Sequence, residues 1–189
     1  AHSQRWVQFP KTPSNVPIFL DHAHYVKWVE EQLMQGNMQN ERHLWTSVRP
    51  NGPERPHVLN RLELRICDLV GNVDLLLAIT ALLELRIINL QNNMTKYDPL
   101  EASNQTPKDL ALLADENDLI AAKSSLDSNL SHWKSGKQIN CRDWINELVL
   151  DVTPLAKELD MFDLLQPIES VLKNGNQSMI WLNSYSKGT

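Results

Sequence analysis

Residues 73–90 are the most apolar part of the chain, and they constrain the fold more than any other feature. Charges at Asp74, Glu84 and Arg86 interrupt them, so no charge-free run is long enough to cross a bilayer. Asn72 precedes the segment and is a suitable residue to begin a helix. We therefore expect a long helix that is apolar nearly all round and buried on several sides.

Two segments of alternating apolar and polar residues precede this helix, at residues 41–49 and 61–68. Alternation of this kind, with β-branched and aromatic residues, is typical of strands. Residues 50–56 between them contain three prolines and Gly52, which indicates a loop. The two segments are expected to pair as an antiparallel hairpin with a long connection.

The rest of the chain is predicted to be mainly helical. Residues 91–105 are polar and are expected to form a linker or long loop inside the domain. Capping residues and apolar spacing predict helices at residues 22–35, 107–123, 141–159, 163–173 and 178–185, and a small hairpin at residues 131–139. The predicted fold class is α+β, helix-rich with a small antiparallel sheet.

Composition excludes several classes of protein. The chain has 189 residues, with 18 Lys and Arg against 23 Asp and Glu, so its net charge of −5 argues against a nucleic-acid binder. Its length suits one domain or one and a half. Two cysteines, Cys67 and Cys141, cannot make a disulfide framework or a thiolate zinc site, and this usage fits a reducing cytoplasm. Cys141 begins a predicted helix, where a thiol pKa can fall, but we interpret it as a small half-buried side chain.

No glycine-rich phosphate-binding motif, nucleophile elbow or HExxH metal motif is present. The chemically informative stretch is the second predicted strand, on which Arg61, Glu63 and Arg65 alternate and so share one face. A carboxylate between two guanidinium groups suits a hard cation with a phosphate, and Arg49 at the end of the neighbouring strand adds a third guanidinium. The alternative is a solvated outer sheet face with cross-strand ion pairs, and spacing alone favours that alternative.

The sequences of these segments resemble those of a known family. "WTSVRP" at residues 45–50, then "RLELRICD" at residues 61–68, then an apolar helix, are similar to the type 2 glutamate–cysteine ligases, and most to their cyanobacterial branch. "ENDLIAAKSSLD" at residues 116–127 resembles a further family segment, except that Ser125 stands where the family usually has glycine. The resemblance covers almost the whole chain but only the C-terminal half of the family's single, glutamine-synthetase-like catalytic domain.

The resemblance implies ATP-dependent joining of L-glutamate to L-cysteine through a γ-glutamyl phosphate, the first step of glutathione synthesis. It implies that Glu63 binds Mg²⁺, that Arg65 contacts ATP and the transferred phosphoryl group, and that Arg49 binds phosphate or a substrate carboxylate. By a more degenerate match, Asn117 and Lys123 are implied to bind the nucleotide. ATP and Mg²⁺ are thus the expected cofactors.

Further expectations follow from the resemblance and its partial coverage. We expect the chain to be a fragment that is inactive alone or active only with the missing half, because one carboxylate is too few for a site with several metal ions. The expected partners are glutamate and cysteine, with no nucleic acid and no membrane, in the cytoplasm and with a homodimer as a family expectation. Two alternatives remain: a carboxylate–amine ligase with another amine acceptor, and a non-catalytic helical interaction module.

Overall fold

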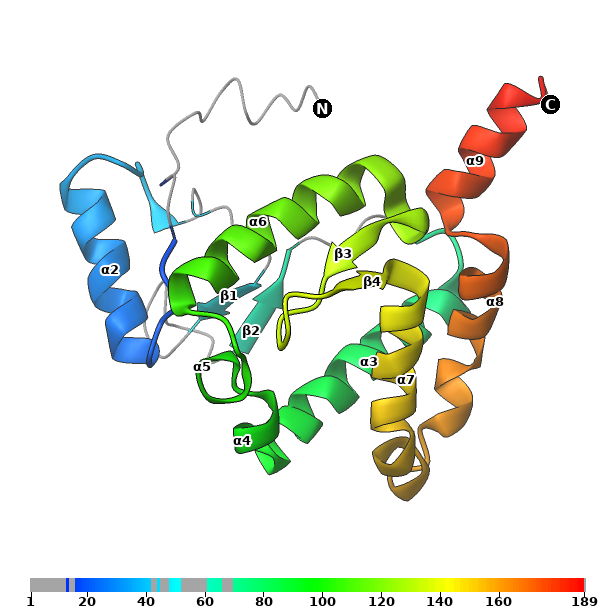
Figure 1. Cartoon of the computed structure of the whole chain (residues 1–189), viewed down its shortest axis with the longest axis horizontal. Helices are drawn as coiled ribbons and strands as arrows, with labels where there is room; N and C mark the ends of the chain where they lie inside the picture. The colour runs from blue at the N-terminus through cyan, green and yellow to red at the C-terminus, as the bar shows by residue number, and fades with distance from the viewer. Residues whose placement is uncertain are drawn as a thin grey trace. The chain divides into compact units, whose positions relative to one another are not determined.

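A computed structural model describes the chain at residue 13 and at residues 16–41, 44, 48–51, 61–65 and 70–188. The chain divides into two compact units, Ala1–Asp68 and Leu69–Thr189, and each is described by itself. Figure 1 shows the order of the elements, in which helices predominate and the strands are short. Two two-stranded antiparallel sheets are present among the described residues, so the predicted helix-rich α+β class is confirmed.

In the first unit, helix α2 (His22–Met34) begins and ends where the sequence predicts. The carboxylate of Asp21 accepts a hydrogen bond from the backbone N–H of His24 and so caps the helix. Gly36, with a φ of 71°, takes the backbone out of the helical conformation. The buried core of this unit consists of Tyr25, Val29, Met38 and Leu44.

The predicted hairpin is present as strands β1 (Val48–Asn51) and β2 (Arg61–Leu64), which pair antiparallel. The register places Val48 opposite Leu64 and Arg49 opposite Glu63. Residues directly opposite one another in such a pair share one face of the sheet. The hairpin therefore brings an arginine position and a glutamate position together on one face.

The strand bounds differ from the prediction. Glu41 lies in a 3₁₀ turn and Leu44 lies outside any strand, whereas Pro50, expected in the loop, belongs to β1. A two-stranded sheet has only edge strands, and an edge strand tolerates a proline without an N–H to donate. Arg65 follows the end of β2, and residues 66–68 of the predicted strand lie outside the described residues.

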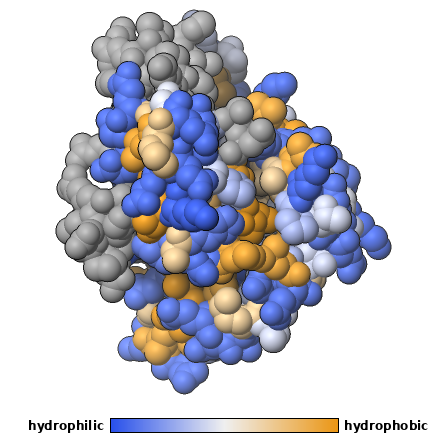
Figure 2. Space-filling model, turned by 90° about the vertical axis from the view of Figure 1, so that its left-hand side faces the viewer, coloured by the Kyte–Doolittle hydropathy of each residue, from blue (hydrophilic) through white to orange (hydrophobic). Residues whose placement is uncertain are grey.

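In the second unit, the long apolar helix is α3 (Val73–Asn92), and the side chain of Asn72 caps it by accepting from the N–H of Leu75 at 3.1 Å. Its buried residues form one stripe, Ala78, Ala81 and Leu85. The expectation of burial on several sides is wrong, since the exposed large side chains include Val73, Leu76, Leu77 and Ile87. Figure 2 shows how apolar residues reach the surface between hydrophilic ones on one face of the molecule.

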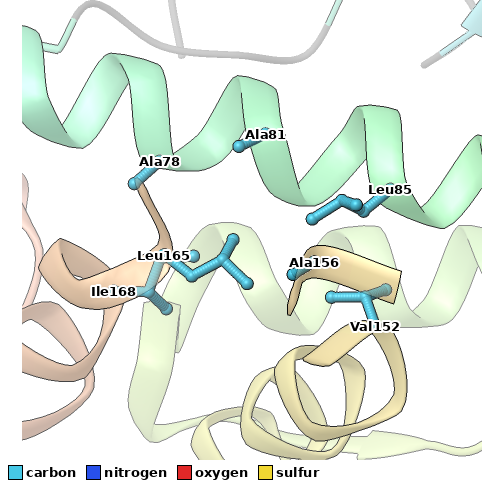
Figure 3. Packing of buried hydrophobic residues seen from close by; sticks show 7 residues of the cluster. All are labelled: Ala78, Ala81, Leu85, Val152, Ala156, Leu165 and Ile168. Carbon is cyan, nitrogen blue, oxygen red and sulfur yellow. The ribbon is translucent and has the colours of Figure 1, made fainter. Parts of the chain in front are cut away.

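The core of the second unit lies where α3 meets α7 (Cys141–Glu158), the 3₁₀ helix η3 (Phe162–Leu165) and α8 (Gln166–Asn174). Figure 3 shows Leu85 directed from α3 toward Val152 and Ala156 of α7. Leu165 and Ile168 join this cluster from η3 and α8. Because these elements all cover the same side of α3, only one stripe of that helix is buried.

Residues 91–105, expected as a polar linker or loop, instead contain two short helices, α4 (Met94–Tyr97) and α5 (Pro99–Ala102). The hydroxyl of Ser103 donates to the carbonyl of Trp133 at 2.6 Å, and the N–H of Asn104 donates to the carbonyl of Lys134 at 2.8 Å. These bonds attach the segment to the loop of the second hairpin. The polar composition of residues 91–105 is therefore that of short helices whose residues are mostly exposed.

The remaining elements agree with the predicted helices and hairpin. They are α6 (Pro107–Ser124), the 3₁₀ helix η2 (Ser125–Asp127), β3 (Asn129–Ser131), β4 (Gln138–Asn140) and α9 (Gln177–Ser186). A reciprocal cap between Thr106 and Asp109 begins α6, and Pro154 lies inside α7 without ending that helix. Among the helices in the described ranges, none has the length and apolar character that a membrane crossing requires.

Ser125 has a backbone conformation that favours glycine, with a φ of 50° and a ψ of −132°. Its hydroxyl accepts a hydrogen bond from the side-chain amide of Asn176 at 2.7 Å. Replacement by alanine or by glycine removes this bond equally, but only glycine removes the steric conflict of the Cβ atom. We therefore expect Ser125→Gly to be about 1–2 kcal/mol more stable than Ser125→Ala.

Urea unfolding of the two variants, with equal slopes, measures this difference. Equal midpoints would show that the Cβ atom of residue 125 causes no strain.

Candidate functional site

The strand β2 carries the central residues of the predicted site. Glu63 is half-buried, whereas its neighbours Arg61, Leu62 and Leu64 are exposed. Across the hairpin, Arg49 occupies the register position opposite Glu63. A carboxylate that is partly withdrawn from water, at a position paired with an arginine position, is a better candidate for ligand binding than an outer-face side chain. Neither the catalytic role of Arg49 nor the metal role of Glu63 is tested by this geometry, and both stay predictions.

Arg65 is half-buried just beyond the end of β2. Its guanidinium donates a hydrogen bond to the backbone carbonyl of Leu44, a buried residue of the unit's core. This bond joins residues 21 positions apart in the sequence. The guanidinium is thus held by the folded core of the unit, and not by the strand alone.

Asn117 lies on α6 and uses its side-chain amide to bind the backbone of strand β3. Its Nδ2 donates to the carbonyl of Ser131 at 2.9 Å, and its Oδ1 accepts from the N–H of the same residue at 2.8 Å. An amide that binds both backbone groups of one residue extends the edge of the strand as another strand would. The structure therefore gives Asn117 a structural role, and its implied nucleotide contact stays a prediction.

Lys123 lies in the last turn of α6, where a cation is favoured by the helix dipole. Its side chain is exposed, and within residues 70–188 no hydrogen bond or ion pair engages its ammonium group. Lys123 belongs to the second unit with Asn117, whereas Arg49, Glu63 and Arg65 belong to the first. Of the two α6 residues, Lys123 is the better candidate for binding a ligand.

Other residues near the C-terminal end of α6 have structural roles that the sequence did not indicate. Asp127 accepts from the guanidinium of Arg142 at 2.7 and 3.1 Å, and Arg142 also donates to the carbonyl of Leu172. Burial raises the pKa of the neighbouring Cys141 thiol, and its hydrogen bond with Ser128 and the charge of Arg142 only partly offset this. Cys141 is a half-buried free thiol, as interpreted from the sequence, and its pKa is not lowered by the helix start.

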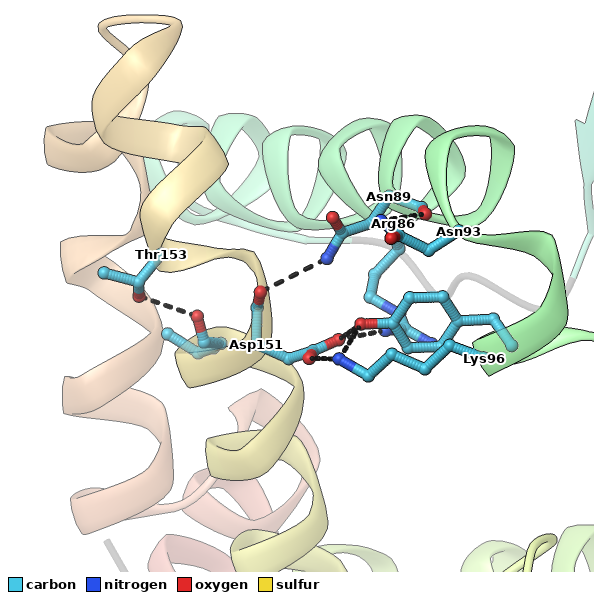
Figure 4. Close-up of polar contacts among 8 residues, drawn as sticks. Arg86, Asn89, Asn93, Lys96, Asp151 and Thr153 are labelled. Carbon is cyan, nitrogen blue, oxygen red and sulfur yellow. Dashed lines mark hydrogen bonds and ion pairs between the residues drawn. The ribbon is translucent and has the colours of Figure 1, made fainter. Parts of the chain in front are cut away.

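A second cluster of charges, which no sequence motif indicated, joins α3, α4 and α7. The carboxylate of Asp151 on α7 lies 2.8 Å from the guanidinium of Arg86 and 2.9 Å from the ammonium of Lys96. Tyr97 donates its hydroxyl to the same carboxylate, and Asn89 donates to the Asp151 carbonyl at 3.2 Å. Figure 4 shows Lys96 and Asp151 directed toward each other from the two helices.

The two charged groups shift each other's pKa. Burial acts to raise the pKa of Asp151, but hydrogen bonds from Tyr97 and Lys96 and the charges of Lys96 and Arg86 outweigh it, so this pKa lies below its ordinary value. Hydrogen bonds with Tyr97 and Asp151 raise the pKa of Lys96, against a smaller effect of burial. Arg86 and Lys96 both pair with the carboxylate of Asp151, so we interpret the cluster as structural.

Magnesium requires oxygen ligands, often one or two carboxylates with phosphate oxygens and water completing the shell. Within the part of the chain that the structure describes, no three His, Cys, Asp or Glu residues gather into a metal site. Glu63 fits the role of a single carboxylate ligand for an ion held mainly by nucleotide phosphates. It does not fit a protein-built site for several ions.

Comparison with known proteins covers nearly the whole chain. The model of a family described as glutamate–cysteine ligase family 2 matches residues 2–189. A protein of Sorangium cellulosum, provisionally named glutamate–cysteine ligase 2, is 25% identical over 187 residues, which are 98% of this chain and 46% of that protein. A protein of the same provisional name from Herpetosiphon aurantiacus is 23% identical over 184 residues, 96% of this chain and 44% of that protein. The chain thus spans less than half the length of these relatives.

Proposed function

Because the chain belongs to glutamate–cysteine ligase family 2, we propose that it forms part of an ATP-dependent ligase that joins L-glutamate to L-cysteine. The observation that carries this proposal is the family match over residues 2–189, which includes the charged strand β2. The relatives' names support the same reaction class at 23–25% identity. Ligation is therefore proposed for the whole protein, of which this chain supplies a part.

The proposed reaction has two steps. A γ-carboxylate oxygen of glutamate attacks the terminal phosphorus of ATP, and the bond to the bridging oxygen breaks, which gives γ-glutamyl phosphate and ADP. The amine of cysteine then attacks the acyl carbon, phosphate leaves with the electron pair of the broken C–O bond, and the nitrogen loses a proton. The product is γ-glutamylcysteine, and we propose that it serves glutathione synthesis and that the protein acts in the cytoplasm.

Phosphoryl transfer needs positioning and charge neutralisation more than covalent chemistry by the protein. We assign Arg65 to the transferred phosphoryl group, because a guanidinium binds two phosphate oxygens at once and the bond to Leu44 orients this one. Arg49 is assigned to a phosphate or a substrate carboxylate, since it stands opposite Glu63 in the hairpin. Lys123, exposed at the end of α6, is assigned to the nucleotide, with Asn117 holding the adjacent strand β3.

Glu63 is assigned as a carboxylate ligand of Mg²⁺. When bound, the ion neutralises the negative charge of the ATP phosphates. The protein's own contribution is to hold the Glu63 carboxylate, partly shielded from water, on a strand that is paired through four residues with β1. A rigid strand keeps a ligand in place more precisely than a loop.

Direct assay of ligation tests the proposal. The protein as its organism produces it, and the 189-residue chain alone, are incubated with ATP, Mg²⁺, glutamate and each of a panel of amines, and ADP and the new amide are measured. We expect the whole protein to form γ-glutamylcysteine in preference to other amides. We expect the chain alone to form none, since no carboxylate group suited to several metal ions gathers among the residues that the structure describes.

Each other result has a clear meaning. If the whole protein prefers another amine, that amine replaces cysteine as the proposed acceptor, and the proposed class of reaction remains ligation. Absence of ADP formation by the whole protein with every amine would overturn the proposal in favour of a non-catalytic helical module. Turnover by the chain alone would contradict the expectation that the site is incomplete.

A further inference from the structure

Helix α6 is followed by a turn at residues 125–128, which we call the α6 turn, and its backbone is strained. Ser125 has a φ of 50° and a ψ of −132°, a conformation that residues other than glycine rarely adopt. Ser128, at the other end of the turn, is only 1% exposed although its side chain is polar. A strained residue and a buried hydroxyl persist where the surrounding structure holds them in place.

Hydrogen bonds from two other segments hold the α6 turn. The side-chain amide of Asn176, the residue before α9, donates to the hydroxyl of Ser125 at 2.7 Å. The N–H of Cys141, at the start of α7, donates to the carbonyl of Ser128 at 2.8 Å. The hydroxyl of Ser128 also donates to the carbonyl of Ser125 at 2.6 Å, within the turn. Both ends of the turn are therefore attached to other elements of the second unit.

Arg142, in the first turn of α7, makes a third attachment. Its Nε and Nη2 atoms lie 3.1 and 2.7 Å from the same carboxylate oxygen of Asp127, and its Nη1 donates to the carbonyl of Leu172 on α8. A guanidinium makes such bonds in fixed, planar directions, which an ammonium group does not. Arg142 thus connects the α6 turn to α7 and α8 at once.

These attachments act on the helix end that carries Lys123. Lys123 lies two residues before the turn, and its side chain is exposed. Six residues earlier, the amide of Asn117 makes two hydrogen bonds to the backbone of Ser131 and so fixes α6 to β3. The backbone of Lys123 is therefore held on both sides. Among the ion pairs of residues 70–188 none includes its ammonium group, which is available to a ligand.

Backbone strain of this kind concentrates at functional sites, where it holds a group in position. We infer that Asp127 and Arg142 are positioning residues, which hold the end of α6 so that the ammonium group of Lys123 meets the phosphates of ATP. This inference rests on the nucleotide role proposed for Lys123. Placement matters because a hydrogen bond weakens steeply as its distance and angle depart from their best values.

Binding of Mg²⁺–ATP to the whole protein, measured by isothermal titration calorimetry, tests the inference without requiring turnover. Lys123→Ala should raise the dissociation constant about tenfold, the usual effect of losing a hydrogen bond between charged groups. Asp127→Ala and Arg142→Lys should each raise it severalfold. The sign is informative for Asp127→Ala, because loss of a negative charge by itself tightens the binding of an anionic nucleotide, whereas loss of position weakens it.

A double variant shows whether the positioning residues act through Lys123. In the background of Lys123→Ala, Asp127→Ala should change the dissociation constant less than about twofold, because the group that it positions is already absent. The control is Arg86→Lys, since Arg86 pairs with an aspartate of the same unit at 2.8 Å but lies outside the α6 turn. This control should bind Mg²⁺–ATP as the unaltered protein does. Far-UV circular dichroism confirms that each variant is folded.

Each other result identifies what fails. Unchanged or tighter binding by Asp127→Ala and Arg142→Lys would overturn the inference, and so would equal weakening by Arg86→Lys or full effects in the Lys123→Ala background. Normal binding by Lys123→Ala would also overturn it, but the proposed ligation would stand if the whole protein still forms the amide. Conversely, the expected affinities in a protein that forms no ADP with any amine would contradict only the proposed ligation.

Discussion

Replacing Glu63 by glutamine is expected to lower the kcat/KM of the whole protein in the proposed ligation about a thousandfold, with little effect on stability. The proposed role of Glu63 is to hold Mg²⁺ on the ATP phosphates, and metal ions supply several kcal/mol of charge stabilisation in such transfers. A loss of about 4 kcal/mol corresponds to this factor in rate. Glutamine has nearly the same size and keeps one carbonyl oxygen, so strand β2 and its pairing with β1 are preserved.

Initial rates at several Mg²⁺ concentrations measure the effect. The control is Glu84→Gln, because Glu84 is an exposed carboxylate on α3, outside the hairpin, and its replacement should change the rate less than twofold. Excess Mg²⁺ should restore part of the Glu63→Gln activity, since a weakened site fills at higher concentration. A rate within a fewfold of the unaltered protein, without any Mg²⁺ dependence, would remove Glu63 from the site and favour a structural ion pair.

Replacing Asp151 by asparagine is expected to cost about 2–3 kcal/mol of unfolding free energy at neutral pH. The change leaves Arg86 and Lys96 facing a neutral amide, with the side chain of Arg86 only 21% exposed. Asp151 is 26% exposed and Lys96 more than half exposed, so water screens the pairs, and the loss is smaller than for a fully buried pair. Urea unfolding of both proteins measures the difference.

The loss depends on pH in a direction that the pKa shifts determine. The pKa of Asp151 is lower in the folded chain than in the unfolded chain, so between these two values the unfolded state binds more protons and stability rises with pH. The contribution of Asp151 is thus complete above the ordinary carboxyl pKa near 4 and disappears as the pH falls through the lower, folded value. The difference between the two proteins should therefore shrink in acid.

The change of stability at alkaline pH follows from the raised pKa of Lys96. Its contribution is present below the ordinary lysine pKa of about 10.4 and is lost as the pH rises through the higher, folded value. Glu158→Gln, at an exposed position of the same helix α7, is the control and should change the stability much less. A stability difference that is constant from acid to neutral pH would show that Asp151 acts through packing alone.

Local elements could be predicted from the sequence because their causes are local. Asp21, Asn72, Thr106 and Asn140 each accept a hydrogen bond from an N–H two or three residues ahead, and each begins a helix where it was expected. The charged strand β2 was also predicted, although strand β1 beside it begins later in the chain than expected and includes Pro50. Strand ends depend on the partner strand, which the alternation of one segment does not specify.

The burial of α3 shows the limit of such reasoning. Its composition predicts burial on several sides, but the elements packed on it cover only the stripe of Ala78, Ala81 and Leu85. Similarly, the bonds of the Asn117 amide to the backbone of Ser131 were not predicted, and the nucleotide contact implied for this residue stays a prediction. Which side of a helix is covered, and which polar groups find partners, depends on residues far away in the chain.

The amino-acid sequence by itself determined the family, the helix starts and the charged strand with Glu63, since each depends on neighbouring residues or on their order. Only the tertiary structure decided that Arg65 is held by the carbonyl of Leu44 and that Asp151 joins Arg86 and Lys96. These partners are separated by 21, 65 and 55 positions along the chain. Contacts at such separations arise from packing of the folded chain, because no local spacing rule connects the residues that make them.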